Sequence, residues 1–285
     1  MRRFLLLLLI GTAYAVFNVT GQQTKPWFTS KEVSDKVYQI DDNGAVNIFL
    51  VVGTDSALVI DTGMGTADLS SFIKTLTTKP LIIINTHGHP DHAGANYQFP
   101  KVYVHPSDSA ASRSFNTPAA RKGAAGTMQA GKSPSASELY KGVEYKTRLI
   151  PVKEGRVFDI GGRKLEVLST PGHTAGSISL LDRGNRLLFT GDNNNTLVWL
   201  FLQGCSPLSQ YQKTLEKQVK MLSLFSTILP GHGPAMSSDF VKDQLECVKG
   251  IISGKLEAKP YKSFAGDAMV STFGKASVAF NPKNL

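Results

Sequence analysis

The chain has 285 residues, of which 41% are hydrophobic and 19% are charged, so it is ordinary for a folded protein and is not a collagen, a coiled coil or a wholly disordered chain. Two cysteines are too few for a disulfide scaffold or a four-cysteine zinc site. The net charge of +9 is compatible with an anionic substrate, a nucleic acid or an anionic surface. Because the sequence has no block of like charges, a basic solvated surface is the preferred interpretation of this charge.

The segment Met1–Ala15 has the pattern of a secretory signal peptide. A basic pair, Arg2-Arg3, precedes the apolar run Phe4–Ile10, and Ala13-Tyr14-Ala15 forms a small-x-small cleavage site. The apolar run is shorter than the roughly 20 residues of a membrane span. We therefore expect an exported protein, periplasmic or secreted, with residues 1–15 removed and no stable membrane anchor; an uncleaved N-terminal anchor is the alternative.

The first half of the mature chain alternates apolar, β-branched runs with turn residues and one amphipathic stretch. Strands are expected where apolar residues alternate or run continuously, and a helix where they recur at helical spacing. The expected strands are Val46–Val52 and Ala57–Ile60 within the strand-like segment Val37–Ile60, then Leu81–Ile84 and Lys101–Val104, and the expected helix carries Leu69, Phe72, Ile73 and Leu76.

A second, similar set of elements follows. Its expected strands are Arg148–Val152, Arg156–Ile160, Lys164–Leu168, Ser177–Leu181, Arg186–Thr190 and Thr227–Leu229, and its helices start at Ser206-Pro207 and at Ser237 or Ser238, the last ending at Gly254. Two β-rich sets with helices bury all their apolar faces if two sheets face each other and the helices lie outside.

We expect residues 16–285 to form a single domain of this kind. Residues 107–137 are rich in Ala, Ser and Gly, which predicts a mobile loop with at most one helix. After Lys255 the pattern is weak. Export would permit a disulfide between Cys205 and Cys247, but the sequence leaves their distance open.

Three of the six histidines lie in one short run that reads THGHPDHAG. The run follows the predicted buried strand Leu81–Ile84, so its side chains leave the carboxyl end of that strand. His87 and His89 can converge on one cation, and Asp91 and His92 can face a second. Imidazole nitrogen with carboxylate oxygen suits zinc and, less selectively, iron or manganese.

Other predicted strands end on the same kind of residue. His173, Asp192 and His232 each follow a strand and lie in a turn that contains glycine, where the backbone can bend sharply. Five of the six histidines and two aspartates therefore predict a two-metal site. The remaining one, His105, precedes a proline and is expected to be structural or on the surface.

In this order, the motifs resemble those of the metallo-β-lactamase-fold hydrolases. The resemblance covers most of the mature chain, including Asp61-Thr62-Gly63, and implies an α/β fold, the αββα sandwich of that family. It implies that Asp61 holds the ligand loop, although a turn-forming aspartate is the alternative. It implies one metal bound by His87, His89 and His173, a second bound by Asp91, His92 and His232, and Asp192 as the bridge between them.

The branches of the family differ at the position of Asp192. Zinc β-lactamases with a cysteine ligand carry it there, whereas the glyoxalase II-like, lactonase and phosphodiesterase branches carry Asp. Asn195 stands where acyl-homoserine lactonases have Tyr, which counts against that branch. The name β-lactamase can therefore describe the fold rather than the substrate.

The expected activity is that of an exported, binuclear zinc-dependent hydrolase of a small ester, lactone, thioester or β-lactam. Two zinc ions per chain would turn a shared water into hydroxide, and Asp91 would hold that hydroxide and pass a proton to the leaving group. Two alternatives of the same fold stay open, a single-iron oxidoreductase like the persulfide dioxygenases and a nuclease or phosphodiesterase. The expected partner is a small molecule rather than a nucleic acid, and the oligomeric state stays open.

Two segments could form substrate walls. The apolar segment Leu197–Leu202 either lines the pocket, with Trp199 or Phe201 against the substrate, or packs in the core. The 107–137 loop is either a passive surface loop or a lid whose cations meet an anionic substrate, namely Arg113, Arg121 and Lys122.

Overall fold

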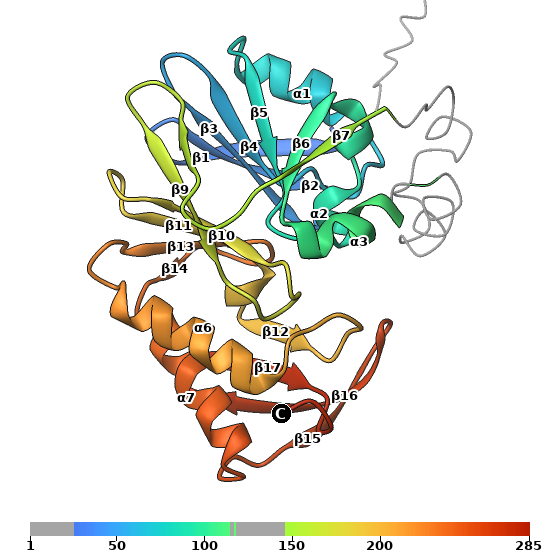
Figure 1. Cartoon of the computed structure of the whole chain (residues 1–285), viewed down its shortest axis with the longest axis vertical. Helices are drawn as coiled ribbons and strands as arrows, with labels where there is room; N and C mark the ends of the chain where they lie inside the picture. The colour runs from blue at the N-terminus through green and yellow to red at the C-terminus, as the bar shows by residue number, and fades with distance from the viewer. Residues whose placement is uncertain (1–25, 115–116, 118–145) are drawn as a thin grey trace, which may run out of the picture.

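A seven-stranded sheet forms the N-terminal half of the computed structural model, which describes residues 26–114, 117 and 146–285 (Figure 1). In sheet order its strands are β1 (Phe28–Ser34), β2 (Val37–Asp42), β3 (Asn47–Val52), β4 (Ala57–Ile60), β5 (Leu81–Ile84), β6 (Lys101–Val104) and β7 (Arg148–Pro151). β1 to β4 are antiparallel, and β4 to β7 are parallel. The carboxyl ends of β4 and β5 therefore lie side by side at one edge of the sheet. The segment that begins with Asp61 and the segment that carries His87 to His92 both leave the sheet at this edge.

A six-stranded sheet faces the first one. Its order is β14 (Met236–Ser237), β13 (Thr227–Pro230), β11 (Leu187–Gly191), β10 (Ile178–Asp182), β9 (Lys164–Ser169) and β8 (Val157–Asp159). β11 and β13 are parallel neighbours, so Asp192 and His232, which follow them, leave the sheet at the same edge. The contact between the sheets is apolar, and the Phe49 and Phe189 rings meet edge to face at 5.3 Å.

Helices cover the outer faces of the two sheets, as the αββα prediction requires (Figure 1). α1 (Leu69–Leu76), α2 (Pro90–Ala93) and α3 (Ser109–Ser114) lie on the side of the first sheet, and α6 (Leu208–Lys220) and α7 (Phe240–Ile252) on the side of the second. α1 forms because Asp68 caps it by accepting from the Ser71 N–H at 2.9 Å, and because Leu69 and Ile73 pack on the sheet.

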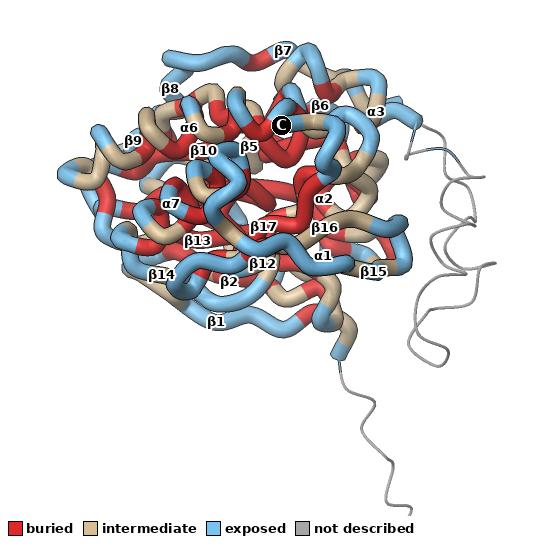
Figure 2. Tube along the Cα trace, turned by 90° about the horizontal axis from the view of Figure 1, so that it is seen from below, coloured by how far each residue is buried: buried red, intermediate tan, exposed pale blue. Residues whose placement is uncertain are grey.

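A third sheet, which the sequence did not predict, closes the C-terminal end. Its order is β12 (Leu197–Leu200), β17 (Ala276–Phe280), β16 (Gly266–Phe273) and β15 (Lys259–Ser263). One face of this sheet places Val198, Val278 and Phe280 in the same apolar cluster as α6, α7 and the outer face of the second sheet. The second and third sheets therefore share one apolar cluster, and the burial-coloured trace shows the buried segments gathered in the interior of the molecule (Figure 2).

Several expectations change in detail. α6 begins at Leu208 with Pro207 as its N-cap, one residue later than the Ser206-Pro207 start that we expected. The start of the 107–137 segment contains one helix, as the sequence allowed, since a short 3₁₀ turn, Pro106–Asp108, leads directly into α3. The rest of the loop, apart from residue 117, lies outside the described residues.

Two further expectations concern the cysteines and the N-terminus. Cys205 and Cys247 are both free thiols. Met1–Ala15 lies outside the described residues, so the signal-peptide prediction stays a prediction. Within the described part of the chain, we find no helix with the length and apolarity needed to cross a bilayer.

Candidate metal centre

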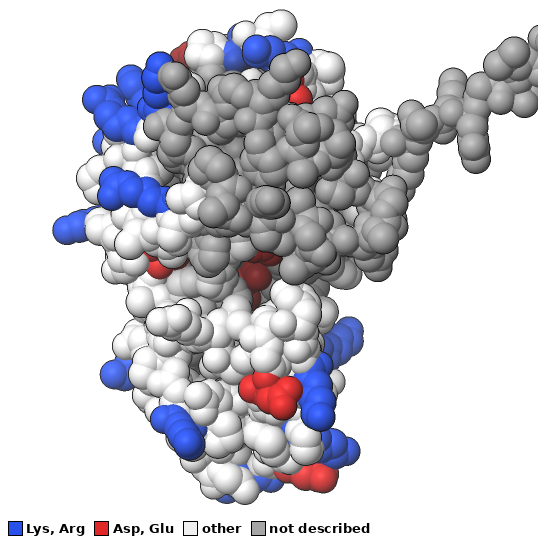
Figure 3. All heavy atoms as spheres, turned by 90° about the vertical axis from the view of Figure 1, so that its right-hand side faces the viewer, with Lys and Arg blue, Asp and Glu red and all other residues white. Residues whose placement is uncertain are grey.

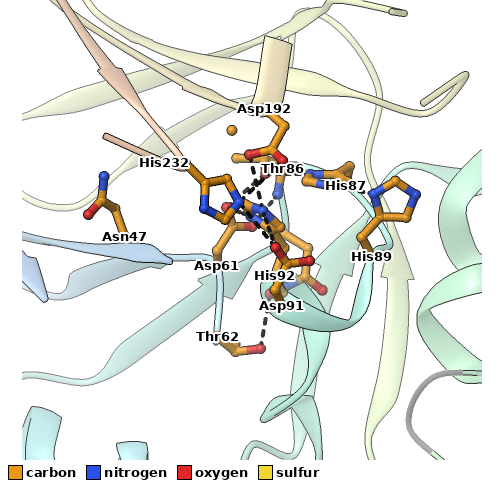
Figure 4. Close-up of polar contacts among 12 residues, drawn as sticks. Asn47, Asp61, Thr62, Thr86, His87, His89, Asp91, His92, Asp192 and His232 are labelled. Carbon is orange, nitrogen blue, oxygen red and sulfur yellow. Dashed lines mark hydrogen bonds and ion pairs between the residues drawn. The ribbon is translucent and has the colours of Figure 1, made fainter. Parts of the chain in front are cut away.

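All seven predicted donor side chains meet where the two facing sheets end (Figure 4). They form two groups, and within each group the potential ligand atoms lie within 4.8 Å of one another. The first group is His87, His89 and His173, and the second is Asp91, His92, Asp192 and His232. These are the two sets that the resemblance implied, with Asp192 placed in the second.

In the first group three ring nitrogens point at one another. His89 Nδ1 is 2.8 Å from His173 Nε2 and 3.1 Å from His87 Nε2. Burial, aided by the neighbouring imidazoles, lowers the pKa of His87 well below its usual value and that of His89 to about 4. Neutral imidazoles keep a nitrogen lone pair free for a cation, and neutral histidine is the form that binds metals.

In the second group two imidazoles alternate with two carboxylates. His232 Nε2 is 3.1 Å from Asp91 Oδ2 and 3.3 Å from Asp192 Oδ2, and His92 Nε2 is 3.2 Å from Asp192 Oδ1. Burial alone would lower the pKa of His232, but the two carboxylates outweigh it and raise that pKa to about 10. Burial alone would raise the pKa of Asp192, but His232 and His92 hold it well below the usual value.

Asp192 connects the two groups. Its Oδ2 lies 3.5 Å from His173 Nε2 of the first group and 3.3 Å from His232 Nε2 of the second. It sits directly after β11 at Gly191, whose φ of +50° lets the chain turn at once into the site. One carboxylate thus reaches ring nitrogens of both groups, as a bridging ligand must.

The donor set fits divalent cations. Among the described residues, His92 Nε2 and Asp192 Oδ1 are buried polar atoms without a hydrogen-bond partner, and they face each other. A buried polar atom without a partner costs roughly 1–3 kcal/mol, and a cation bound between these two would give both a partner. Imidazole and carboxylate together are donors typical of zinc.

Asp61 holds the second group from behind. Its carboxylate accepts from the Thr86 N–H at 2.7 Å and the Thr86 hydroxyl at 2.8 Å, and it lies 2.8 Å from His92 Nδ1. With Nδ1 bound to Asp61, His92 presents Nε2 to the site. These are the contacts of a loop-holding residue, and they agree with the interpretation that the resemblance implied for Asp61.

The segment directly after Asp192 positions two ligand loops, a role that the sequence analysis missed. Asn193 Oδ1 accepts from the His173 N–H at 2.8 Å, and Asn195 Oδ1 accepts from the His232 N–H at 3.1 Å. Between them, Asn194 is buried and hydrogen-bonds to glutamines of α6 and α7. Three consecutive asparagines after a ligand were the available signal, because buried amides require several partners.

Two more missed residues tie ligand loops together across long sequence separations. Asn47 Nδ2 donates to the carbonyls on either side of His232, Pro230 at 3.0 Å and Gly233 at 2.9 Å. Asp108 accepts from the backbone N–H of Gly88, in the first histidine run, and from Gly176, beyond His173. Neither residue stands in a recognisable motif, and only the folded chain brings them to the site.

The remaining candidates lie around this centre. His105 is outside both groups, and its Nδ1 accepts from the Ser107 N–H at 3.3 Å, as expected of a structural residue. Alternate residues of the Leu197–Leu202 segment differ in burial. Val198 and Leu200 lie in the core, whereas Trp199 and Phe201 are half-buried. Arg113 is exposed on α3, and Arg121 and Lys122 lie outside the described residues.

Comparisons with known proteins agree with this site. A family model described as the metallo-beta-lactamase superfamily matches residues 41–238. The human acyl-coenzyme A thioesterase MBLAC2 is 29% identical over 229 residues, covering 72% of this chain and 81% of that protein. A hydroxyacylglutathione hydrolase of Mesorhizobium japonicum is 28% identical over 166 residues, covering 58% of this chain and 53% of that protein.

Solved structures show the same fold at low identity. The sec-alkylsulfatase Pisa1 from a Pseudomonas species superposes with a TM-score of 0.60 at 19% identity, covering 80% of this chain and 42% of that one. A metallo-beta-lactamase from Pontibacter korlensis gives 0.55 at 19% identity, covering 78% and 99%. The matched segment includes all seven predicted donors and Asp61 in family order. The chain is therefore a hydrolase of the metallo-β-lactamase superfamily.

Proposed function

We propose that this protein is a binuclear zinc-dependent hydrolase of acyl thioesters. The observation that carries the proposal is the position of Asp192, whose carboxylate lies between ring nitrogens of both histidine groups. A single cation would fill one group and leave the other as a buried set of unsatisfied or protonated side chains. Two cations use all seven donors, which is why two zinc ions are favoured over the single-iron alternative.

When bound, the two cations would supply Lewis acidity for a substrate carbonyl and lower the pKa of a water molecule. The chain's own residues keep the geometry in which this chemistry can occur. Asp61 and Thr86 fix the ring of His92, and the Trp199 carbonyl fixes His173, whose Nδ1 lies 2.7 Å away. Both contacts leave Nε2 of each ring aimed at the site.

Asp91 is the residue suited to carry a proton. Its carboxylate reaches both histidines of the second group, and its side chain is 25% exposed, more than that of Asp192 at 10%. Burial alone would raise its pKa, but His92 and His232 hold the pKa of Asp91 well below the usual value, so it is ionised at neutral pH. An ionised, reachable carboxylate can accept a proton from the attacking water and deliver it to the departing thiolate.

The choice of thioester rests on the relatives rather than on the site alone. A human protein named as an acyl-coenzyme A thioesterase matches 72% of this chain, and another relative is named as a hydroxyacylglutathione hydrolase, whose substrate is also a thioester. Asp192 stands where some zinc β-lactamases carry a cysteine ligand, so this residue favours the branches of the family that lack that cysteine. Esters and lactones share the attacked carbonyl and remain second candidates, ahead of β-lactams and phosphodiesters.

The test is a substrate panel on the zinc-loaded protein. Acyl-coenzyme A thioesters, simple lactones, a β-lactam and a phosphodiester are compared by kcat/KM, and the thioester is expected to be cleaved at least about tenfold faster than the others. His89→Ala should abolish the hydrolysis, while His105→Ala, a histidine outside the site, should leave it unchanged. Preferred cleavage of the phosphodiester or the β-lactam would contradict the thioester assignment.

We also propose that the protein is exported after loss of residues 1–15. The support is the Arg2-Arg3 pair, the apolar run after it and the small-x-small site that ends at Ala15. Intact mass of the protein from its native host should give an N-terminus near Val16. A retained Met1 in a cytosolic fraction would contradict export and leave the hydrolase assignment untouched.

A further inference from the structure

Four aromatic side chains form a cluster beside the metal centre that none of the site chemistry uses. The Trp199 ring lies 5.3 Å from Phe201, 5.5 Å from Phe264 and 6.3 Å from Tyr261, measured between ring centroids. Phe201 is in turn 6.2 Å from Tyr261, and the Trp199 indole N–H donates to the Tyr261 hydroxyl at 3.2 Å. We call Trp199, Phe201, Tyr261 and Phe264 the aromatic platform.

The third sheet presents this platform on the face opposite to the one that packs on α6 and α7. Successive strand residues point to opposite faces, so Val198 and Leu200 enter the core under α6 and α7 while Trp199 points the other way. The β15–β16 hairpin brings Tyr261 to the same side, and Phe264 lies at its turn. The Phe264 side chain is 94% exposed, which is far more than any other large apolar residue described.

The platform adjoins a ligand of the metal centre through the backbone of Trp199. The backbone carbonyl of Trp199 lies 2.7 Å from Nδ1 of His173, so the platform's central residue also holds a ligand of the first group. Figure 3 shows acidic side chains set back at mid-height of this face, with largely uncharged surface directly below them. A substrate whose carbonyl lies at the metals can therefore extend over uncharged protein surface.

We propose that the aromatic platform binds the acyl chain of the substrate and makes the enzyme selective for long, apolar acyl groups. The inference rests on the proposed thioesterase function. A coenzyme A thioester has one apolar half, the acyl chain, and one polyanionic half, the nucleotide. Four aromatic rings, three of them half-buried and one exposed, match the apolar half, because burying them against methylene groups removes apolar surface from water.

The kinetic test varies both the length of the acyl chain and the side chain at Phe264. Phe264→Ser should lower kcat/KM for a dodecanoyl thioester about tenfold and that for the acetyl thioester less than about twofold, because only the long chain reaches the hairpin. Phe273→Ser is the matched control, since Phe273 is a 42% exposed phenylalanine of the same sheet outside the platform. Equal losses for both chain lengths, or equal losses in both variants, would overturn the proposal.

A binding test separates the platform from the proposed activity. Dodecanoate should change the tryptophan emission saturably, with acetate as the inactive control. The change should be lost in Trp199→Phe, which leaves Trp27 as the one tryptophan of the sequence, and weakened several-fold in Phe264→Ser. Such a result supports the platform even if no thioester is hydrolysed. An emission change that needs phosphatidylcholine vesicles rather than the monomeric fatty acid, or no change at all, would overturn it.

Discussion

The carboxylate of Asp192 and the imidazole of His92 face each other at 3.2 Å in a place where neither atom has a hydrogen-bond partner among the described residues. Such pairs are costly in a protein interior unless a charge of the right sign is supplied. In the chain without a bound cation, a proton on His92 supplies this charge. The nearby carboxylates, against the effect of burial, raise the pKa of His92 well above its usual value. A divalent cation bound by this group would take the place of that proton, so its binding would release protons.

Asp61→Asn tests the support behind this group. Asp61 has a φ of +66°, a conformation that asparagine tolerates, so the backbone should persist. The amide cannot match both the Thr86 and His92 contacts, and we expect zinc affinity to fall about tenfold to a hundredfold. Titration against a coloured chelator measures this affinity, with circular dichroism as the control for folding. Unchanged affinity would show that Asp61 only shapes the turn.

At this scale the sequence predicted the donors and missed most of the residues that hold them. The histidines and aspartates could be found because each follows a predicted strand in a glycine-containing turn. Asn47 and Asp108 act across separations of 183 and 68 residues, on Pro230 and Gly176, and no local pattern records such contacts. Asp61 was assigned only because the resemblance supplied its role.

At the scale of elements, the short turn before α3 links the two ligand loops of the first group. Asp108 is 4% exposed, and its carboxylate accepts from Gly88 N–H at 2.8 Å, Gly176 N–H at 2.9 Å and the Thr174 hydroxyl at 2.7 Å. The 107–137 segment therefore begins as part of the scaffold of the site.

Asp108→Ala should destabilise the protein strongly. It leaves the buried N–H donors of Gly88 and Gly176 without this acceptor, at roughly 1–3 kcal/mol each, so the free energy of unfolding should fall by about 2–6 kcal/mol. Asp108→Asn keeps one acceptor oxygen and should lose about half as much. Urea unfolding measures both. Equal stability of the alanine variant and the wild type would mean that these hydrogen bonds do not hold the loops.

Asp42, at the end of β2, is a titrating group that hydrogen-bonds to the loop after β4. Asp42 accepts from the Trp27 indole N–H and the Met64 N–H, both at 2.7 Å, and burial raises its pKa from 3.8 to about 6. The folded state thus binds this proton more tightly than the unfolded chain does. Its contribution to stability is complete below about pH 4 and is lost as pH rises through about 6.

Asp42→Asn removes this titration. Relative to the wild type, the variant should gain stability as the pH is raised from about 4 to about 7, by up to about 3 kcal/mol. The difference between the two unfolding free energies at each pH isolates Asp42 from the other carboxylates. A difference that does not change with pH would contradict the raised pKa.

Prediction of elements succeeded where short apolar runs lie between turn residues. β4, β5 and β6 have the predicted boundaries, although only β4 is buried along its whole length. β15, β16 and β17 were not predicted, since much of β15 and β16 is exposed and their sequences show little alternation. Their place is decided by pairing with β12 and by packing on α7, which are tertiary effects.

At the scale of the whole molecule, the third sheet belongs to the same core as the second. Val278 and Phe280 of β17 share one apolar cluster with Leu215 of α6 and Leu188 of β11. A chain ending at residue 254 should therefore fail to unfold cooperatively, since it exposes that cluster. Calorimetry of the full chain should show one transition. A truncated chain with a wild-type melting temperature would instead make the C-terminal segment a separate unit.

The proposed function depends most on two cations held by seven donors that meet at Asp192. The direct measurement is metal content by mass spectrometry, combined with hydrolysis before and after chelation. We expect about two zinc ions per chain, loss of hydrolysis when they are removed, and recovery when zinc is returned. One iron per chain, or full hydrolysis by protein stripped of metal, would contradict it.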